Sequence, residues 1–206
     1  MRFQRPVFIG APPEEVYAWH ARPGAHQRLV PPWERVRVLS RSGGIADGDE
    51  ALLEMRLGPL PLRWRARHRD HVPGRQFADE QVGGPFARWR HTHRFVPADA
   101  GTRLEDDIEH TPPLGPLGAL ADAVFIRRTL ARTFTYRHAV TKGDIETQRR
   151  YAGPAMRIAI TGASGLVGSH LGPFLTTAGH DVLRLARRGT GDTGRGEAGT
   201  ASWGPA

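Results

Sequence analysis

The chain of 206 residues contains no cysteine. This absence excludes disulfide bonds, thiolate metal sites and cysteine nucleophiles, and it is typical of a protein from a reducing compartment. The chain also lacks the run of about 18 apolar residues that a membrane-spanning helix needs. The first ten residues, MRFQRPVFIG, have neither a long apolar stretch nor a small-residue cleavage site, so they do not indicate a signal peptide. We therefore expect a cytoplasmic location.

Lysine is almost absent as well. Lys142 is the only lysine among 29 basic residues, so arginine carries nearly all of the formal net charge of +8 at pH 7. Such a charge can indicate binding to nucleic acid. However, an arginine bias with abundant alanine, glycine and proline is typical of a GC-rich genome. The arginines also alternate along predicted strands opposite acidic residues, without forming a basic run. We expect no nucleic-acid partner.

The composition changes near residue 150, and the length allows about one and a half domains. We expect a first domain at residues 1–148, a linker with a Gly-Pro pair at residues 149–155, and part of a second domain at residues 156–206. Residues 189–200 are rich in glycine and threonine, which predicts a loop.

The first domain has the pattern of an α+β fold. A strand is predicted at residues 2–9, a helix from the Pro-Pro-Glu-Glu sequence to about His20, and a loop at residues 22–34. Alternation with a period of two then predicts six strands, at residues 34–41, 49–57, 61–72, 75–83, 86–97 and 102–111. A long helix, predicted over residues 117–145, must cover the sheet. One stripe of that helix contains Leu120, Val124, Ala131, Phe134 and His138.

One face of the predicted sheet combines aromatic with ionisable side chains, whereas the other carries rows of arginines and acids. Buried polar groups need partners. A cavity that holds water or a ligand would supply them. Alternatively, the histidines lie at strand ends or hydrogen-bond one another. The candidate cavity residues are Trp64, His68, Trp89, His91, His93, Phe95, Asp106 and His110.

His91-Thr92-His93 is the one pattern that suggests a metal. It places two imidazoles on one strand face about 6–7 Å apart, and Asp106 could supply a third ligand. Without cysteines or a His-Glu motif this is a weak indication, so we assign no metal ligands. We also assign no catalytic residue, because no nucleophile lies in a recognisable motif.

Three segments, at residues 22–34, 84–95 and 134–138, resemble the cyclase/START-like (SRPBCC) superfamily. In particular, they resemble the member that precedes an epimerase-like domain in bacterial fusion proteins. The resemblance covers most of residues 1–150. It implies a helix-grip fold, in which a curved antiparallel sheet surrounds a long C-terminal helix. It also implies a cavity for an apolar or amphipathic small molecule as the partner.

The second part of the chain predicts a strand at residues 156–160, a glycine turn, a helix at residues 166–178 and a strand at residues 180–186. Glycines at the spacing of this turn allow a tight bend, a close approach of backbone to phosphate, and close helix–strand packing. N–H groups at the following helix N-terminus favour a pyrophosphate. The pattern predicts the start of a Rossmann unit. Its expected cofactor-binding residues are Thr161, Gly162, Ala163, Ser164, Gly165, Leu166, Val167 and Gly168.

The glycine spacing resembles extended and atypical short-chain dehydrogenases/reductases, specifically NAD(P)-dependent epimerase/dehydratase-like proteins. In that family the second strand usually ends in an acid when NAD is bound. Here Arg187 and Arg188 follow it, and a guanidinium can pair with a 2′-phosphate. We therefore expect NADP, with NAD as the alternative; a solvated loop is the other explanation of the two arginines. The segment at residues 202–205 resembles the family's Trp-x-Pro segment before the third strand.

A complete enzyme of this kind needs more strands and a catalytic tyrosine–lysine pair. The only lysine is Lys142, and Tyr136 precedes it by six residues in the other domain, so no pair can be assigned. We expect the N-terminal part of a longer fusion protein, or a chain shortened by a premature stop. One hypothesis is a hydrophobic small-molecule binding domain fused to the cofactor-binding start of an NADP-dependent oxidoreductase. The alternative is a stand-alone carrier module with a vestigial C-terminal segment.

Overall fold

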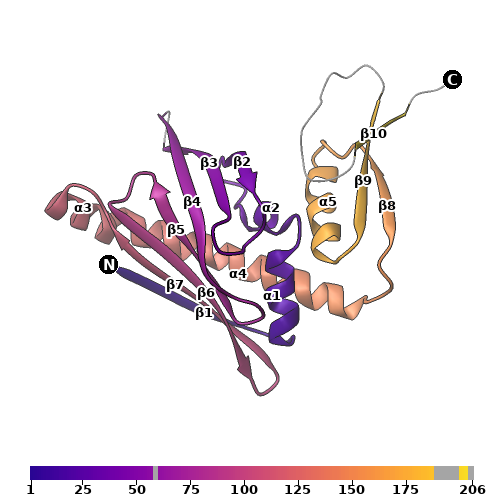
Figure 1. The fold of residues 1–206 in the computed structure, drawn as a ribbon, viewed down its shortest axis with the longest axis horizontal. Helices are drawn as coiled ribbons and strands as arrows, with labels where there is room; N and C mark the ends of the chain where they lie inside the picture. The colour runs from indigo at the N-terminus through magenta and orange to yellow at the C-terminus, as the bar shows by residue number, and fades with distance from the viewer. Residues whose placement is uncertain (58–59, 188–199, 204–206) are drawn as a thin grey trace.

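The computed structural model describes residues 1–57, 60–187 and 200–203. It shows a larger and a smaller unit, and the smaller one follows the C-terminal end of a long helix (Figure 1). Within the described ranges, no helix is long and apolar enough to cross a membrane.

The larger unit is built on an antiparallel sheet of seven strands in the order β1-β7-β6-β5-β4-β3-β2. Strands β2 to β7 form a meander, and β1 pairs with β7 at the edge. The strands are β1 (Arg2–Ile9), β2 (Arg37–Ser42), β3 (Glu50–Leu57), β4 (Leu60–Val72), β5 (Gln76–Gly83), β6 (Arg88–Ala98) and β7 (Gly101–Thr111). Each predicted strand is present, with small shifts at its ends.

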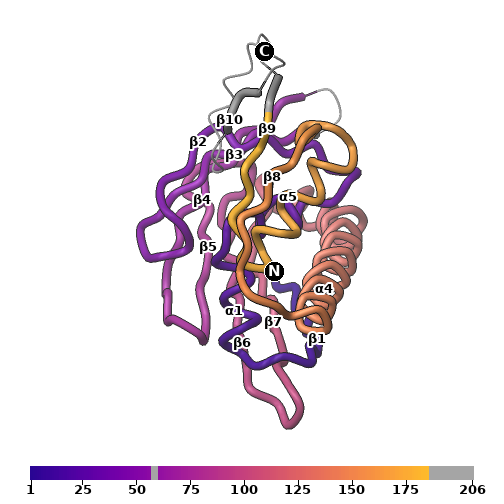
Figure 2. The backbone as a smooth tube through the Cα atoms, turned by 90° about the vertical axis from the view of Figure 1, so that its right-hand side faces the viewer, coloured from indigo at the N-terminus to yellow at the C-terminus, as the bar shows by residue number. Residues whose placement is uncertain are grey.

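Helices lie on one side of this sheet, and the longest runs along it (Figures 1 and 2). They are α1 (Pro13–Ala21), α2 (Ala25–Leu29), α3 (Gly115–Ala121) and α4 (Arg127–Arg150), with a π-helical turn, η1 (Asp122–Ile126), between the last two. A meander that grips a long C-terminal helix is the helix-grip fold, so the expected fold class is confirmed.

Two details of the helices differ from the sequence-based expectation. Helix α2 lies inside the segment expected to be a loop. The predicted helix at residues 117–145 is longer at both ends and contains the π-helical turn. An extra residue in that turn rotates the preceding residues by about 100° relative to a continuous α-helix. As a result Leu120 and Val124 are more than 60% exposed, whereas Phe134 and His138 face the sheet side and are buried.

The core of the larger unit consists of two apolar clusters. One joins α1 and the end of α4 to the sheet, and contains Ile9, Ala11, Val16, Trp19, Ala25, Ile45, Phe77, Phe95, Leu104 and Ile145. The other joins the first half of α4 to β7, and contains Ile108, Leu130 and Phe134. Members of both clusters touch a group of buried histidines: Phe77 and Phe95 on one side, Phe134 on the other.

The smaller unit has a parallel sheet in the order β10-β9-β8. Its elements are β8 (Arg157–Thr161), α5 (Gly168–Thr177), β9 (Asp181–Arg187) and β10 (Thr200–Trp203). In chain order, the strands are arranged third-second-first, which is the first half of the Rossmann order. This confirms the expected incomplete Rossmann unit. The segment at residues 202–205 coincides in part with β10 itself, and residues 204–205 lie outside the described ranges.

The two units pack against each other. A Cβ atom on Gly24, at the start of α2, would lie 2.4 Å from Thr176 Oγ1 on α5, so only glycine permits this approach. Arg22 Nη1 donates to the carbonyl oxygen of Thr177 (2.8 Å), and Gln148 Nε2 donates to that of Phe174 (3.2 Å). Helix α4 continues to Arg150, so the linker expected at residues 149–155 begins inside the last turn of that helix.

Candidate functional site

Asp106 on β7 is the centre of a buried polar cluster in the larger unit. Its side chain points inward because Leu104 and Ile108, two residues away on either side, fill the core. Asp106 Oδ1 accepts a hydrogen bond from His91 Nε2 (2.8 Å), and Oδ2 accepts one from His138 Nε2 on α4 (2.5 Å). All three residues are less than 9% exposed, so a sheet strand and the gripped helix are joined by charge-assisted hydrogen bonds.

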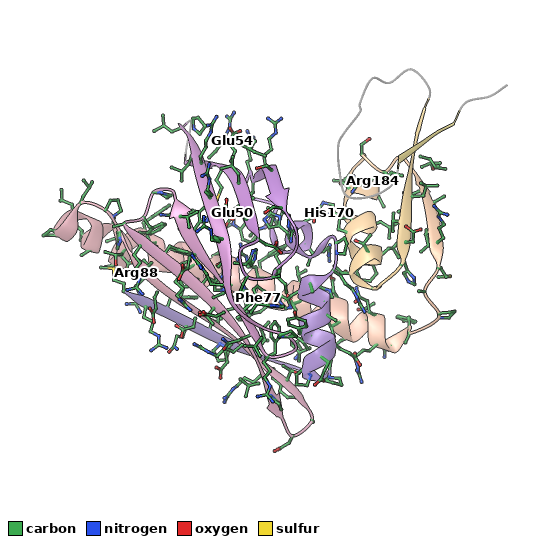
Figure 3. The ribbon with its side chains drawn as sticks, in the orientation of Figure 1. Glu50, Glu54, Phe77, Arg88, His170 and Arg184 are labelled. Carbon is green, nitrogen blue, oxygen red and sulfur yellow. The ribbon has the colours of Figure 1, made fainter. Side chains whose placement is uncertain are left out.

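His93 completes this group. The antiparallel register of β6 and β7 places His93 directly opposite Asp106, and His93 Nδ1 lies 2.7 Å from Asp106 Oδ1. The atoms are not aligned for a hydrogen bond, so among the described residues this buried nitrogen has no partner. Phe77 on β5 stacks on the His93 ring at 4.4 Å between centroids. Figure 3 shows Phe77 near the middle of the larger unit.

Electrostatics favour an ionised carboxylate in this cluster. Burial alone would raise the pKa of Asp106, but His93 and the hydrogen bonds from His138 and His91 outweigh it and hold that pKa well below the usual value. Burial, together with the neighbouring His91, lowers the pKa of His93. Burial also lowers the pKa of His20, whose ring lies 5.8 Å from that of His93, to about 4. At neutral pH the cluster therefore holds an ionised Asp106 carboxylate beside the rings of His93 and His20, which burial keeps neutral.

The other candidate cavity residues lie in three further places. Trp64 and Trp89 form an aromatic cluster with Phe86, with centroid distances of 4.8–5.8 Å. His110 lies beside this cluster and hydrogen-bonds the buried Asp122 of the π-helical turn. His68 is half-buried near the carbonyl oxygen of Asp49, and Phe95 is part of an apolar core cluster.

Sequence reasoning missed four participants: His20, Asp79, Asp122 and His138. His138 was already on the predicted buried stripe and in a motif segment, so its histidine type was a usable signal. Asp79 lies two residues after the buried Phe77 on the same strand, so both side chains are on the same face, and this spacing predicts an inward carboxylate. His20 and Asp122 had no such signal, because each depends on a helix whose docking the sequence does not reveal.

The glycine turn of the smaller unit has the geometry that its sequence predicts. Gly162 has a φ of +64°, which favours glycine. A Cβ atom on Gly168 would lie 2.3 Å from the carbonyl oxygen of Gly162, so the helix can begin this close to the strand only with glycine there. Leu166 and Val167 are 84% and 74% exposed. Thr161, Ala163, Ser164 and Gly165 complete the turn between β8 and α5.

Of the two arginines expected to select NADP, the structure describes the backbone of one. Arg187 is the last residue of β9, and Arg188 lies outside the described ranges.

A pocket of about 360 Å³ lies where the units meet, and the sequence did not predict it. Its polar lining includes Gln27 and Ser40 from the larger unit and Thr176 and Arg184 from the smaller one. Arg184 is labelled in Figure 3.

Comparison with known proteins finds a matching family for each of the two units. Residues 9–137 match the model of the family described as polyketide cyclase / dehydrase and lipid transport. The chain belongs to this family. Residues 158–200 match part of the NAD dependent epimerase/dehydratase family. The predicted resemblances are therefore confirmed.

Solved structures show the same division. A nucleoside-diphosphate sugar epimerase from Corynebacterium glutamicum is 31% identical, with a TM-score of 0.67 over 89% of this chain. The match spans only 38% of that protein. The Zhui aromatase/cyclase from Streptomyces sp. R1128 is 19% identical, with a TM-score of 0.59, and the match covers 75% of this chain and 99% of the other. TTHA0849 from Thermus thermophilus is 17% identical, with a TM-score of 0.53 over 68% and 97% of the two chains. No curated protein matches the chain.

Proposed function

We propose that the helix-grip unit binds an apolar or amphipathic small molecule on the inward face of β3 and β4. The observation that carries this proposal is a contrast in burial along the sheet. The inward residues Leu53 on β3 and Leu62 and Trp64 on β4 are only half-buried, whereas inward residues of β7, such as Leu104 and Ile108, are at most 1% exposed. An apolar surface of this kind inside a fold is where a hydrophobic ligand gains most from leaving water.

The neighbourhood of this surface adds specificity to the proposal. The Trp64–Trp89–Phe86 cluster offers aromatic ring faces and edges to a flat or chain-like apolar molecule. His110 lies 5.7 Å from the Trp89 ring, and its Nδ1 has no hydrogen-bond partner within the described part of the chain. A polar group of an amphipathic ligand would supply that partner. The family description, which includes lipid transport, supports the same ligand class.

Titration with 8-anilinonaphthalene-1-sulfonate, an amphipathic fluorescent probe, tests this proposal. We expect saturable binding that Trp64→Ala weakens by about tenfold, because about 1–3 kcal/mol of aromatic and apolar contact is lost. The matched control is Trp33→Ala, since Trp33 is 43% exposed and packs on Tyr136 and Arg132. Equal affinity of the wild type and Trp64→Ala would contradict the proposal. Native mass spectrometry of the purified chain would identify a natural ligand that remains bound.

A second function is favoured by the glycine turn. We propose that residues 161–168 bind the pyrophosphate of a nicotinamide dinucleotide, because this glycine-rich turn is largely exposed and leads from the end of β8 directly into the N-terminus of α5. Arg187 and Arg188, from their position in the sequence alone, favour NADP over NAD. The chain spans 38% of the length of the epimerase that it matches. We therefore propose cofactor binding for this chain and no catalytic step.

Calorimetric titration with NADPH and NADH separates the parts of this second proposal. We expect saturable binding of NADPH that is tighter than that of NADH. Equal or tighter binding of NADH would contradict the assigned preference. No saturable binding of either dinucleotide below millimolar concentration would contradict a cofactor site in this chain.

A further inference from the structure

Asp79, His91 and His93 bring three metal-ligating side chains together on the inward face of the large sheet. One ligand atom from each lies within 4.8 Å of the other two. The arrangement follows from strand pairing, because Asp79 on β5 is directly opposite His91 on β6, and His93 is two residues further along the same face. The His-x-His pattern alone was too weak to predict a site. The missing information was the carboxylate from the neighbouring strand.

The hydrogen bonds around His91 leave its other nitrogen free to coordinate. Asp106 Oδ1 lies 2.8 Å from His91 Nε2 and accepts its hydrogen bond, which places the proton of His91 on Nε2. His91 Nδ1 therefore presents a lone pair. The atom facing it, at 3.6 Å, is Asp79 Oδ2, which is itself an acceptor. This separation is too long for a hydrogen bond.

Asp79 Oδ2 is buried and has no hydrogen-bond partner among the residues that the structure describes. A buried carboxylate oxygen opposite an imidazole lone pair is unfavourable unless a cation lies between them. His93 adds a second imidazole at the same place, and its ligand atom lies within 4.8 Å of those of Asp79 and His91.

The surroundings hold these side chains in position. A carboxylate that accepts a hydrogen bond from the far nitrogen of a ligating histidine is the usual outer partner in protein metal sites, and Asp106 has this position relative to His91. Phe77 stacks on His93 at 4.4 Å, and the edge of Phe134 meets His91 at 5.2 Å. These ring contacts restrict the rotation of both imidazoles.

We propose that Asp79, His91 and His93 bind a divalent transition-metal ion of the Zn²⁺ type. Two imidazoles and one carboxylate suit Zn²⁺, Co²⁺ and Fe²⁺ better than Mg²⁺ or Ca²⁺, which prefer oxygen ligands. Three protein ligands leave a fourth position for water or for a bound molecule. The ion has a route to the site because the Asp79 side chain is 29% exposed, against 4% for His91. This metal site does not depend on the proposed ligand surface at Trp64.

Calorimetric titration with Zn²⁺ on chelator-treated, tag-free full chain tests the proposal. We expect one ion per chain with micromolar or tighter affinity, and a loss of at least about tenfold in Asp79→Asn. In Co²⁺ titrations, visible d–d absorption should report direct coordination and should be weaker in Asp79→Asn at the same Co²⁺ concentration. The matched control is Glu80→Gln, which makes the same chemical change one residue away. Glu80 faces outward and pairs with Arg90, so this variant should bind like the wild type.

The absence of stoichiometric Zn²⁺ binding, or equal affinity in the wild type and Asp79→Asn, would overturn the proposal. Circular dichroism of Asp79→Asn establishes that the variant is folded, and His91→Gln, which replaces a second ligand, should show the same loss of affinity. The fluorescent-probe titration of Asp79→Asn should match that of the wild type. A failure of the metal proposal is thereby distinguished from a failure of the ligand proposal.

Discussion

The two units of this chain assemble their candidate sites in opposite ways. In the larger unit, Asp106 and His138 come from a strand and a helix far apart in the sequence, and both are buried. In the smaller unit, the candidate site is a continuous, largely exposed turn of eight residues. The buried cluster therefore contributes to the stability of the unit that holds it, whereas the turn depends on local backbone geometry. Substitutions should separate these two dependences.

The largest effect is expected from removing the centre of the buried cluster. Asp106→Ala leaves His91 and His138 without their shared acceptor, and we expect the free energy of unfolding of the larger unit to fall by about 3–5 kcal/mol. Asp181→Ala in the smaller unit is the control, because that carboxylate is 68% exposed in its pair with Arg157. It should cost less than about 1 kcal/mol.

Urea unfolding in the presence of a chelator, followed by circular dichroism, measures both variants. If Asp106→Ala does not fold, Asp106→Asn should give a smaller loss in the same direction. Similar losses for Asp106→Asn and Asp181→Ala would remove the contrast between the units.

The next effect concerns the glycine turn. In Gly168→Ala the new methyl group meets the Gly162 carbonyl oxygen at 2.3 Å and Ala163 Cα at 2.6 Å, so the turn must shift. We expect the smaller unit to lose about 2 kcal/mol and NADPH affinity to fall with it. Gly172→Ala, on the same helix, meets nothing within 4 Å and should stabilise α5 by about 0.5–1 kcal/mol.

Hydrogen exchange of the α5 amides distinguishes the two glycine variants, since protection should fall in Gly168→Ala and rise in Gly172→Ala. The same direction of change in both would show that the turn has no special steric requirement.

A smaller effect is expected at the contact between the units. Gly24 has a φ of +92°, and a Cβ atom there would also lie 2.8 Å from the carbonyl oxygen of Pro173. Gly24→Ala should therefore weaken the packing of α2 on α5 by about 1–2 kcal/mol. Limited proteolysis should cleave near residues 151–156 faster than in the wild type, while the buried Asp106 cluster keeps its exchange protection. Unchanged cleavage would mean that the contact does not hold the units together.

The smallest effect depends on pH. Burial, with smaller contributions from Arg137 and Arg41, lowers the pKa of His26 on α2 to about 4. Between about pH 6.5 and pH 4 the unfolded chain takes up a proton at this imidazole and the folded chain does not, so stability falls as the pH falls. We expect His26→Gln to lose about 1 kcal/mol less than the wild type between pH 7 and pH 5. Parallel pH profiles of the two proteins would contradict this assignment.

The same contrast explains what the sequence could predict. The turn at residues 161–168 was recognisable because all of its requirements lie in one continuous segment. Strand alternation likewise placed His91, His93 and Asp106 on one face. The partners of Asp106 could not be assigned, because they depend on how α4 docks on the sheet. The period of 3.6 residues predicted that Leu120 and Val124 share the buried stripe of the long helix. The π-helical turn interrupts that period, and both side chains are exposed.

Helix α4 has a mechanical consequence for both units. His138 holds Asp106 near the middle of this helix, and Gln148 contacts α5 ten residues later, about 15 Å along the axis. No break in the helix separates these two residues. A displacement of α4 at His138 would therefore also move Gln148, which contacts Phe174 and Thr177. Helix α4 therefore connects the buried Asp106 cluster of the larger unit to the contact with the smaller one, in addition to the contacts of Arg22 and Gly24.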